Sequence, residues 1–174
     1  MTTAAGIVMI AARSHPESRA FARDVGERLA RIAAVQDVLL DPARDKSLAE
    51  IVPLLASAYG DGKAIRFGAL PDVSLGDHAM QALALTFGEL ATNSLKYGAL
   101  KNGDPIGIEG AAEGDRLYLT WREPTLFGAS RQGGQGLELI DRIIRASNGT
   151  ATYERADDQL TVRVSFPIAG EVSG

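Results

Sequence analysis

The chain contains no cysteine, which excludes disulfide bonds and metal sites built from thiolates. It also contains no apolar run long enough to cross a bilayer, and residues 6–12 are too short for a convincing signal peptide. The formal net charge of −4 provides no general attraction to nucleic acid or to an anionic membrane surface. We therefore expect a cytoplasmic protein with no membrane segment and no nucleic-acid partner.

Histidine is also scarce, with only His15 and His78 in 174 residues. His15 precedes a proline in a predicted turn, and His78 lies early in a predicted helix. We expect both to be surface residues.

The most informative segment present is ALALTFGELATNSLKYGAL, residues 82–100. Glu89, Asn93 and Lys96 are separated by four and three residues, so a helix carries them on one side. An amide oxygen can ligate a hard cation, a carboxylate can orient a water or a phosphate acceptor, and a lysine can neutralise phosphate charge. The same spacing also fits a solvated polar stripe on an amphipathic helix. The residues expected to hold this helix against a core are Leu83, Leu85, Phe87, Leu90 and Leu95.

The part of this segment that reads ELATNSLKYGAL, residues 89–100, resembles the N-box of the HWE family of bacterial histidine kinases. The resemblance implies ATP and Mg²⁺ as cofactors. It further implies that Asn93 coordinates the magnesium of MgATP and that Glu89, as the catalytic residue, lies beside the transferred phosphate. Lys96 is the expected phosphate-binding cation.

A second motif, LYLTWRE at residues 117–123, resembles the strand of the family that ends in W-x-E. Related kinases carry an aspartate at the last position, where it hydrogen-bonds the adenine amine, so Glu123 is the matching candidate for base recognition. The alternation of Leu117, Leu119 and Trp121 by itself predicts a half-buried strand, with Trp121 in the core rather than stacked on a ligand.

A third motif, GGQGLELI at residues 133–140, resembles the GFGxxLI segment of the family. Gly134 and Gly136 precede a predicted helix, where backbone N–H groups can approach phosphate closely. The position between a strand and a helix, after the other two motifs, favours a phosphate-binding loop over an ordinary turn.

The order of elements predicts an α+β protein, a two-layer α/β sandwich preceded by a helical hairpin. The family resemblance implies the Bergerat ATPase fold for this sandwich. We expect residues 1–42 to form the dimerisation or phosphotransfer-like hairpin and residues 43–174 the ATP-binding domain. The predicted helices cover about residues 4–13, 17–40, 47–59 and 136–147, with the N-box helix starting near residue 75. The predicted strands cover about residues 64–67, 105–110, 116–122, 150–155 and 160–166.

Residues 21–40 resemble the second dimerisation helix of the family. They carry apolar residues at helical spacing that would form a seam between helices: Val25, Leu29, Ile32, Val35 and Leu39. We expect a homodimer through the N-terminal helices, and a response regulator or another signalling protein as partner.

The chain departs from the family at three places. Gly88 replaces the histidine before the N-box glutamate, and Pro124 and its successors replace the glycines and proline that follow W-x-E. The acceptor motif H-R-x-K-N is also missing.

These departures leave several functions open. The first is the ATP-binding catalytic part of an HWE histidine kinase that phosphorylates a histidine from another segment or chain. The alternatives are a kinase-derived adaptor that dimerises and docks a response regulator without ATP turnover, or an anti-sigma-type serine kinase, whose members lack a long helical hairpin.

Overall fold

A computed structural model describes residues 47–57, 64–124, 135–156 and 158–169 of the chain. The chain divides into two units, Met1–Arg44 and Asp45–Gly174, and all of the described residues belong to the second. The predictions for the hairpin at residues 1–42, for its apolar seam and for His15 lie outside the described residues.

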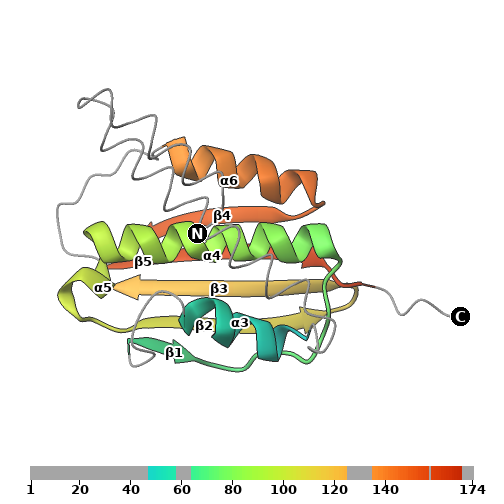
Figure 1. Cartoon of the computed structure of the whole chain (residues 1–174), viewed down its shortest axis with the longest axis horizontal. Coiled ribbons are helices and arrows are strands. Elements are labelled where there is room, and N and C mark those ends of the chain that lie inside the picture. Colours follow the sequence, from blue (N-terminus) through green and yellow to red (C-terminus); the bar gives the residue numbers. More distant parts are fainter. Residues whose placement is uncertain (1–46, 58–63, 125–134, 157, 170–174) are drawn as a thin grey trace, which may run out of the picture. The chain divides into compact units, whose positions relative to one another are not determined.

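The second unit is built on one mixed sheet with the strand order β1-β2-β3-β5-β4 (Figure 1). The strands are β1 (Ile65–Phe67), β2 (Ile106–Glu113), β3 (Arg116–Pro124), β4 (Thr150–Ala156) and β5 (Gln159–Pro167). Strand β1 pairs with β2 in parallel, and the other neighbours are antiparallel. The described helices are α3 (Leu48–Ser57), α4 (Asp77–Tyr97), α5 (Ala99–Asn102) and α6 (Gln135–Ala146).

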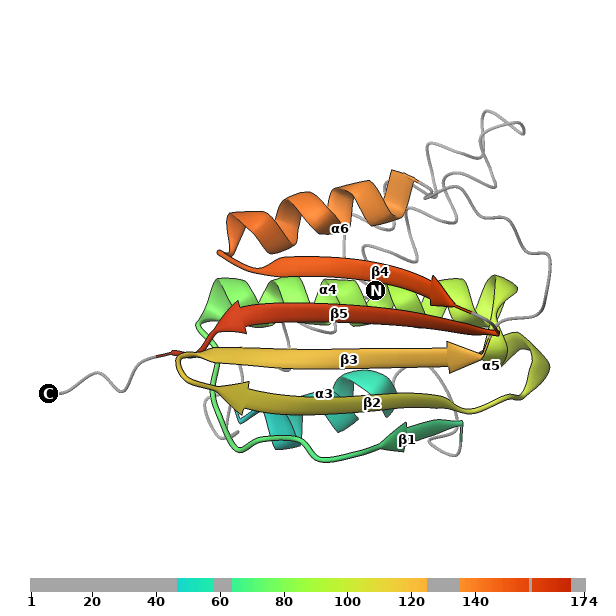
Figure 2. The ribbon, with the colours of Figure 1, turned by 180° about the vertical axis from the view of Figure 1, so that it is seen from behind.

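Helices α3 and α4 cover one face of the sheet, and α6 lies beside α4 next to β4 (Figure 1). Alternation along β3 explains this layering, because Leu117, Leu119 and Trp121 are buried while Tyr118 between them is 41 % exposed. From behind, no described helix lies over the other face (Figure 2). Cross-strand ion pairs join polar side chains on that face, Arg122 with Glu109 and Arg163 with Glu154.

The predicted α+β sandwich is confirmed. Two boundaries and one additional helix are the differences from the sequence prediction that have a clear structural reason. Helix α4 begins at Asp77, because Leu75 forms an isolated β-bridge with Ile168. Strand β2 continues to Glu113, since its antiparallel pairing with β3 runs to the turn. The short helix α5 was not predicted at all. No helix among the described residues combines the length and apolarity that a bilayer span needs.

The turn between α6 and β4 leaves no space for a side chain at Gly149. Asn148 adopts the left-handed conformation at φ 56°, and the N–H of Gly149 donates to the carbonyl of Ile144 at 2.9 Å. A methyl group at position 149 would lie 2.8 Å from Ile144 Cγ2, from Phe166 Cε1 and from the carbonyl oxygen of Ser165.

We therefore expect Gly149→Ala to lower the free energy of unfolding by about 2 kcal/mol, the usual scale of overpacking in a filled core. Chemical denaturation measures the difference. The control is Gly107→Ala, where the new methyl would meet only Arg122 Cβ at 4.0 Å, and no loss of stability is expected. An equal loss in both variants would contradict the steric explanation.

Candidate functional site

Helix α4 packs one side against the sheet. The predicted site residues of this helix lie on a different side. Leu83, Phe87 and Leu90 are at most 4 % exposed, as predicted, and the ring of Phe87 lies 6.2 Å from that of Trp121. The burial of Trp121, only 2 % exposed, confirms its predicted place in the core.

The prediction that Leu95 belongs to the buried side is wrong. Leu95 is 44 % exposed and Leu85 is half-buried, whereas Ala91 and Ser94 are buried. Successive side chains of an α-helix are rotated by about 100° about the helix axis, so Leu95 points about 100° away from the buried Ser94. In the last turns of α4 the buried positions are thus occupied by the small residues Ala91 and Ser94.

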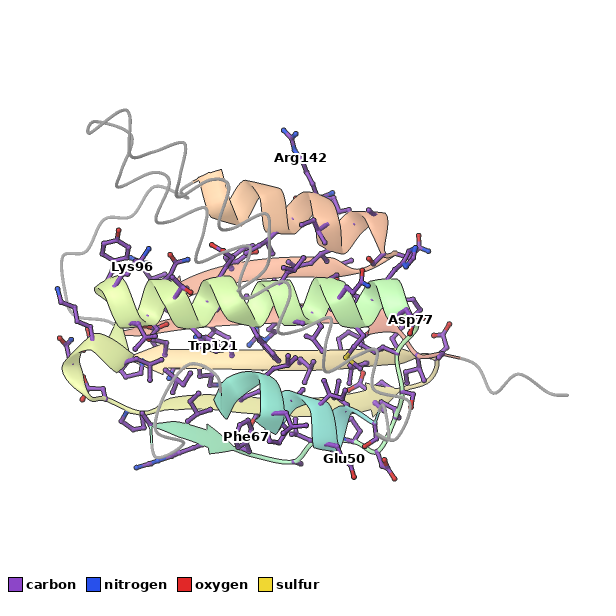
Figure 3. All side chains as sticks on the ribbon, in the orientation of Figure 1. Glu50, Phe67, Asp77, Lys96, Trp121 and Arg142 are labelled. Carbon is purple, nitrogen blue, oxygen red and sulfur yellow. The ribbon has the colours of Figure 1, made fainter. Side chains whose placement is uncertain are left out.

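Glu89, Asn93 and Lys96 lie together on one side of α4, because about 100° per residue places all three within a narrow sector. The centre of this sector is about 120° around the helix from the stripe of Leu83, Phe87 and Leu90. Glu89 and Asn93 are half-buried and Lys96 is exposed. Figure 3 shows Lys96 at the end of α4 nearest α5. The structure thus brings a carboxylate, an amide and an ammonium to one helix face near its end, a composition suited to phosphate and a hard cation.

Gly88 is buried in α4, and its carbonyl accepts a hydrogen bond from Thr92 Oγ1 at 2.7 Å. The position at which the HWE pattern has histidine is thus a buried glycine in this chain. Glycine inside a helix costs roughly 0.5–1 kcal/mol relative to alanine.

Glu123 is only 4 % exposed at the end of β3, and both of its carboxylate oxygens are engaged. Oε1 accepts from the backbone N–H of Ala99 at 2.8 Å, and Oε2 accepts from Trp121 Nε1 at 3.2 Å. The carboxylate therefore fastens the end of β3 to the start of α5. A base amine could bond to it only through the remaining acceptor positions of these same oxygens.

The glycine motif is described only in part. Gly136 lies in the first turn of α6, which starts at Gln135, while Gly134 lies outside the described residues. The loop that follows Pro124 also lies outside them.

No group of three or more histidine, aspartate or glutamate side chains that could hold a metal occurs within the described ranges. A magnesium ion at Asn93 would therefore need the phosphate oxygens of its nucleotide as further ligands, which is how magnesium commonly binds in nucleotide sites.

Farther along the sheet, partial burial raises the pKa of the Tyr153 phenol, and nearby Asp141 raises it further. The phenol is thus neutral at neutral pH and can donate a hydrogen bond.

Sequence reasoning did not identify Ser94 as a site residue. Ser94 is 1 % exposed, and its hydroxyl accepts from the backbone N–H of Leu100 at 3.0 Å. The sequence carries no signal for this role, because the burial of Ser94 and its bond to Leu100 exist only in the folded chain.

The sequence matches no protein-family model. It is 27 % identical over 172 residues to blue-light-activated histidine kinase 1 of Erythrobacter litoralis, an alignment that covers 93 % of this chain and 48 % of that protein. The chain therefore spans about half the length of this relative.

Solved structures show the same fold. The histidine kinase domain of the Erythrobacter litoralis EL346 blue-light-activated kinase matches with a TM-score of 0.59 at 12 % identity, over 94 % of this chain and 83 % of that one. The histidine kinase AdeS of Acinetobacter baumannii matches with a TM-score of 0.56 at 16 % identity, over 88 % and 84 %. The histidine kinase domain of the E. coli osmosensor EnvZ matches with a TM-score of 0.52 at 15 % identity, over 74 % and 90 %. The chain is homologous to a blue-light-activated histidine kinase and has the fold of histidine kinase catalytic domains.

Proposed function

We propose that this chain is the ATP-binding catalytic part of an HWE-type histidine kinase in a two-component system. It would transfer a phosphoryl group from MgATP to a histidine supplied by another segment or another chain. The observation that carries the proposal is the placement of Glu89, Asn93 and Lys96 on one side of α4, away from its buried stripe. The homology to a blue-light-activated histidine kinase supports the same reaction class.

In this proposal each residue has a distinct role. Asn93 ligates magnesium through its amide oxygen, and Lys96 neutralises phosphate charge. Glu89 orients the incoming acceptor beside the transferred phosphate. Backbone N–H groups around Gly134 and Gly136 approach the phosphates, and Glu123 lies at the base end.

One observation favours a second candidate, the adaptor that dimerises and docks a response regulator without ATP turnover. Both oxygens of Glu123 already accept hydrogen bonds from the protein, which reduces what they can offer an adenine amine. Dimerisation through the N-terminal helices and docking of a response regulator or similar signalling protein belong to both candidates.

We expect the chain to bind MgATP, and Asn93→Ala to remove the magnesium-dependent part of that binding, with an affinity at least roughly tenfold weaker. Isothermal titration calorimetry with a nonhydrolysable analogue, with and without magnesium, measures both effects. The matched control is Gln81→Ala, which removes an exposed amide from the same helix and should leave binding unchanged.

Absence of heat or thermal shift at millimolar nucleotide would contradict the kinase proposal and leave the adaptor. A magnesium-dependent signal that persists in Asn93→Ala would place the metal elsewhere.

A further inference from the structure

The short helix α5 has no capping side chain of its own. Its N-cap residue is Gly98, and the helix is four residues long. Two side chains outside α5 cap it instead, since Glu123 accepts from the N–H of Ala99 and Ser94 accepts from the N–H of Leu100. Because the first N–H groups of a helix have no partner within it, these two bonds fix where α4 stops and α5 starts.

The carboxylate of Glu123 is itself held from the opposite side. The indole of Trp121 donates to Oε2, and Trp121 is fixed in the core against Phe87 of α4. The carboxylate therefore connects a rigid strand to the end of α4.

The fit around the carboxylate is tight. A methyl group at Gly98 would lie 1.8 Å from Glu123 Oε1 and 3.0 Å from the Cα of Ser94. The N–H of Gly98 also donates to the carbonyl of Ser94 at 2.8 Å. The last turn of α4, which carries Lys96, thus ends in a junction made by Ser94, Gly98 and Glu123.

We propose that Glu123 and Ser94 are positioning residues that set the last turn of α4 and thereby the phosphate-binding end of the site. This inference rests on the proposed function, because it assigns Glu123 a role besides contact with the base. Glu123 then affects any ligand that binds at Asn93 and Lys96, including one without a nucleobase. Ser94 affects the same ligands through its hydrogen bond to Leu100. Its hydroxyl is buried within the junction, so we assign it no direct contact with a ligand.

The test compares MgATP with magnesium tripolyphosphate, which has the phosphates but no base, by calorimetry. Gln at position 123 can keep the bond from Ala99, but its NH₂ group meets the indole N–H, so one hydrogen bond is lost. We expect Glu123→Gln and Ser94→Ala each to weaken both ligands by a similar factor, roughly tenfold. Glu113→Gln, at the exposed end of β2, is the matched control and should change neither affinity.

If Glu123→Gln weakens MgATP and leaves tripolyphosphate unchanged, Glu123 only recognises the base and the proposal is wrong. A second variant tests the contact between the two donors, the NH₂ group introduced at position 123 and the indole N–H of Trp121. Trp121→Phe removes the opposing donor, so Glu123→Gln should cost tripolyphosphate affinity clearly less in the Trp121→Phe background than in the wild type. Equal costs in the two backgrounds would overturn the proposed arrangement.

An experiment without ligand separates this inference from the proposed function. Amide hydrogen exchange in the free protein should become faster at Lys96, Tyr97 and Ala99 in both Glu123→Gln and Ser94→Ala, and stay unchanged in Glu113→Gln. If the wild type binds neither ligand but these amides respond, the kinase proposal fails while the junction stands. Unchanged exchange at these amides would refute the junction itself.

Discussion

Replacing Gly98 by alanine should cost about 3 kcal/mol or more of folding free energy, although the change adds a single methyl group. The new Cβ would lie 1.8 Å from Glu123 Oε1 and 3.0 Å from Cδ. The carboxylate must then leave its place, and the N–H of Ala99 loses its acceptor. Overpacking typically costs about 1–3 kcal/mol, and a buried charged group that loses its partner costs a similar amount again.

Urea denaturation measures this loss as a lower transition midpoint at an unchanged slope. Gly76→Ala is the control, because no atom lies within 4 Å of the methyl it would add, and its expected effect is below about 1 kcal/mol. A double-mutant cycle makes the cause specific. In a Glu123→Ala background the clashing oxygen is gone, so Gly98→Ala should cost much less there. Equal costs in both backgrounds would show that the methyl clashes with something other than the carboxylate.

The elements that could be predicted from sequence are those with a clear period. The apolar residues of α4 recur at helical spacing over many turns, and buried and more exposed residues alternate along β3. For both elements, the pattern predicts the type of secondary structure and the side that is buried. Four-residue α5 has too few residues for a period, and it exists because Glu123 and Ser94 cap it from elsewhere. The parallel pairing of β1 with β2 likewise depends on contacts between distant segments.

In the candidate site, too, some features follow from the spacing of residues in the sequence, and others depend on contacts between distant segments. The spacing of Glu89, Asn93 and Lys96 places them on one side of a helix, and the structure has them on one side. The alternation of β3 also puts Glu123 on the same buried face as Trp121, so its burial could be predicted. Its partner, the N–H of Ala99, is 24 residues away in the sequence, and only the folded chain shows it. Leu95 was misplaced because small residues, Ala91 and Ser94, take the positions nearest the core.

The second large effect concerns the helices before residue 40, which lie outside the described residues. We expect the chain to dimerise through the apolar seam and Leu29→Asp to convert the dimer to a monomer. Each fully buried aliphatic side chain contributes about 1.5–3 kcal/mol, and a symmetric interface contains the residue twice. Losing both leucines and burying two carboxylates should therefore weaken dimerisation by more than about a hundredfold.

Light scattering across the micromolar range measures the mass of the wild type and of Leu29→Asp. Ala34→Asp is the matched control, because position 34 falls on the opposite side of the predicted helix from the seam, and it should stay dimeric. A wild type that is monomeric at high micromolar concentration would refute the dimer. A dimer indifferent to the charge at position 29 would mean that this apolar seam packs within its own chain, since a buried interface cannot accept two unpaired carboxylates without loss.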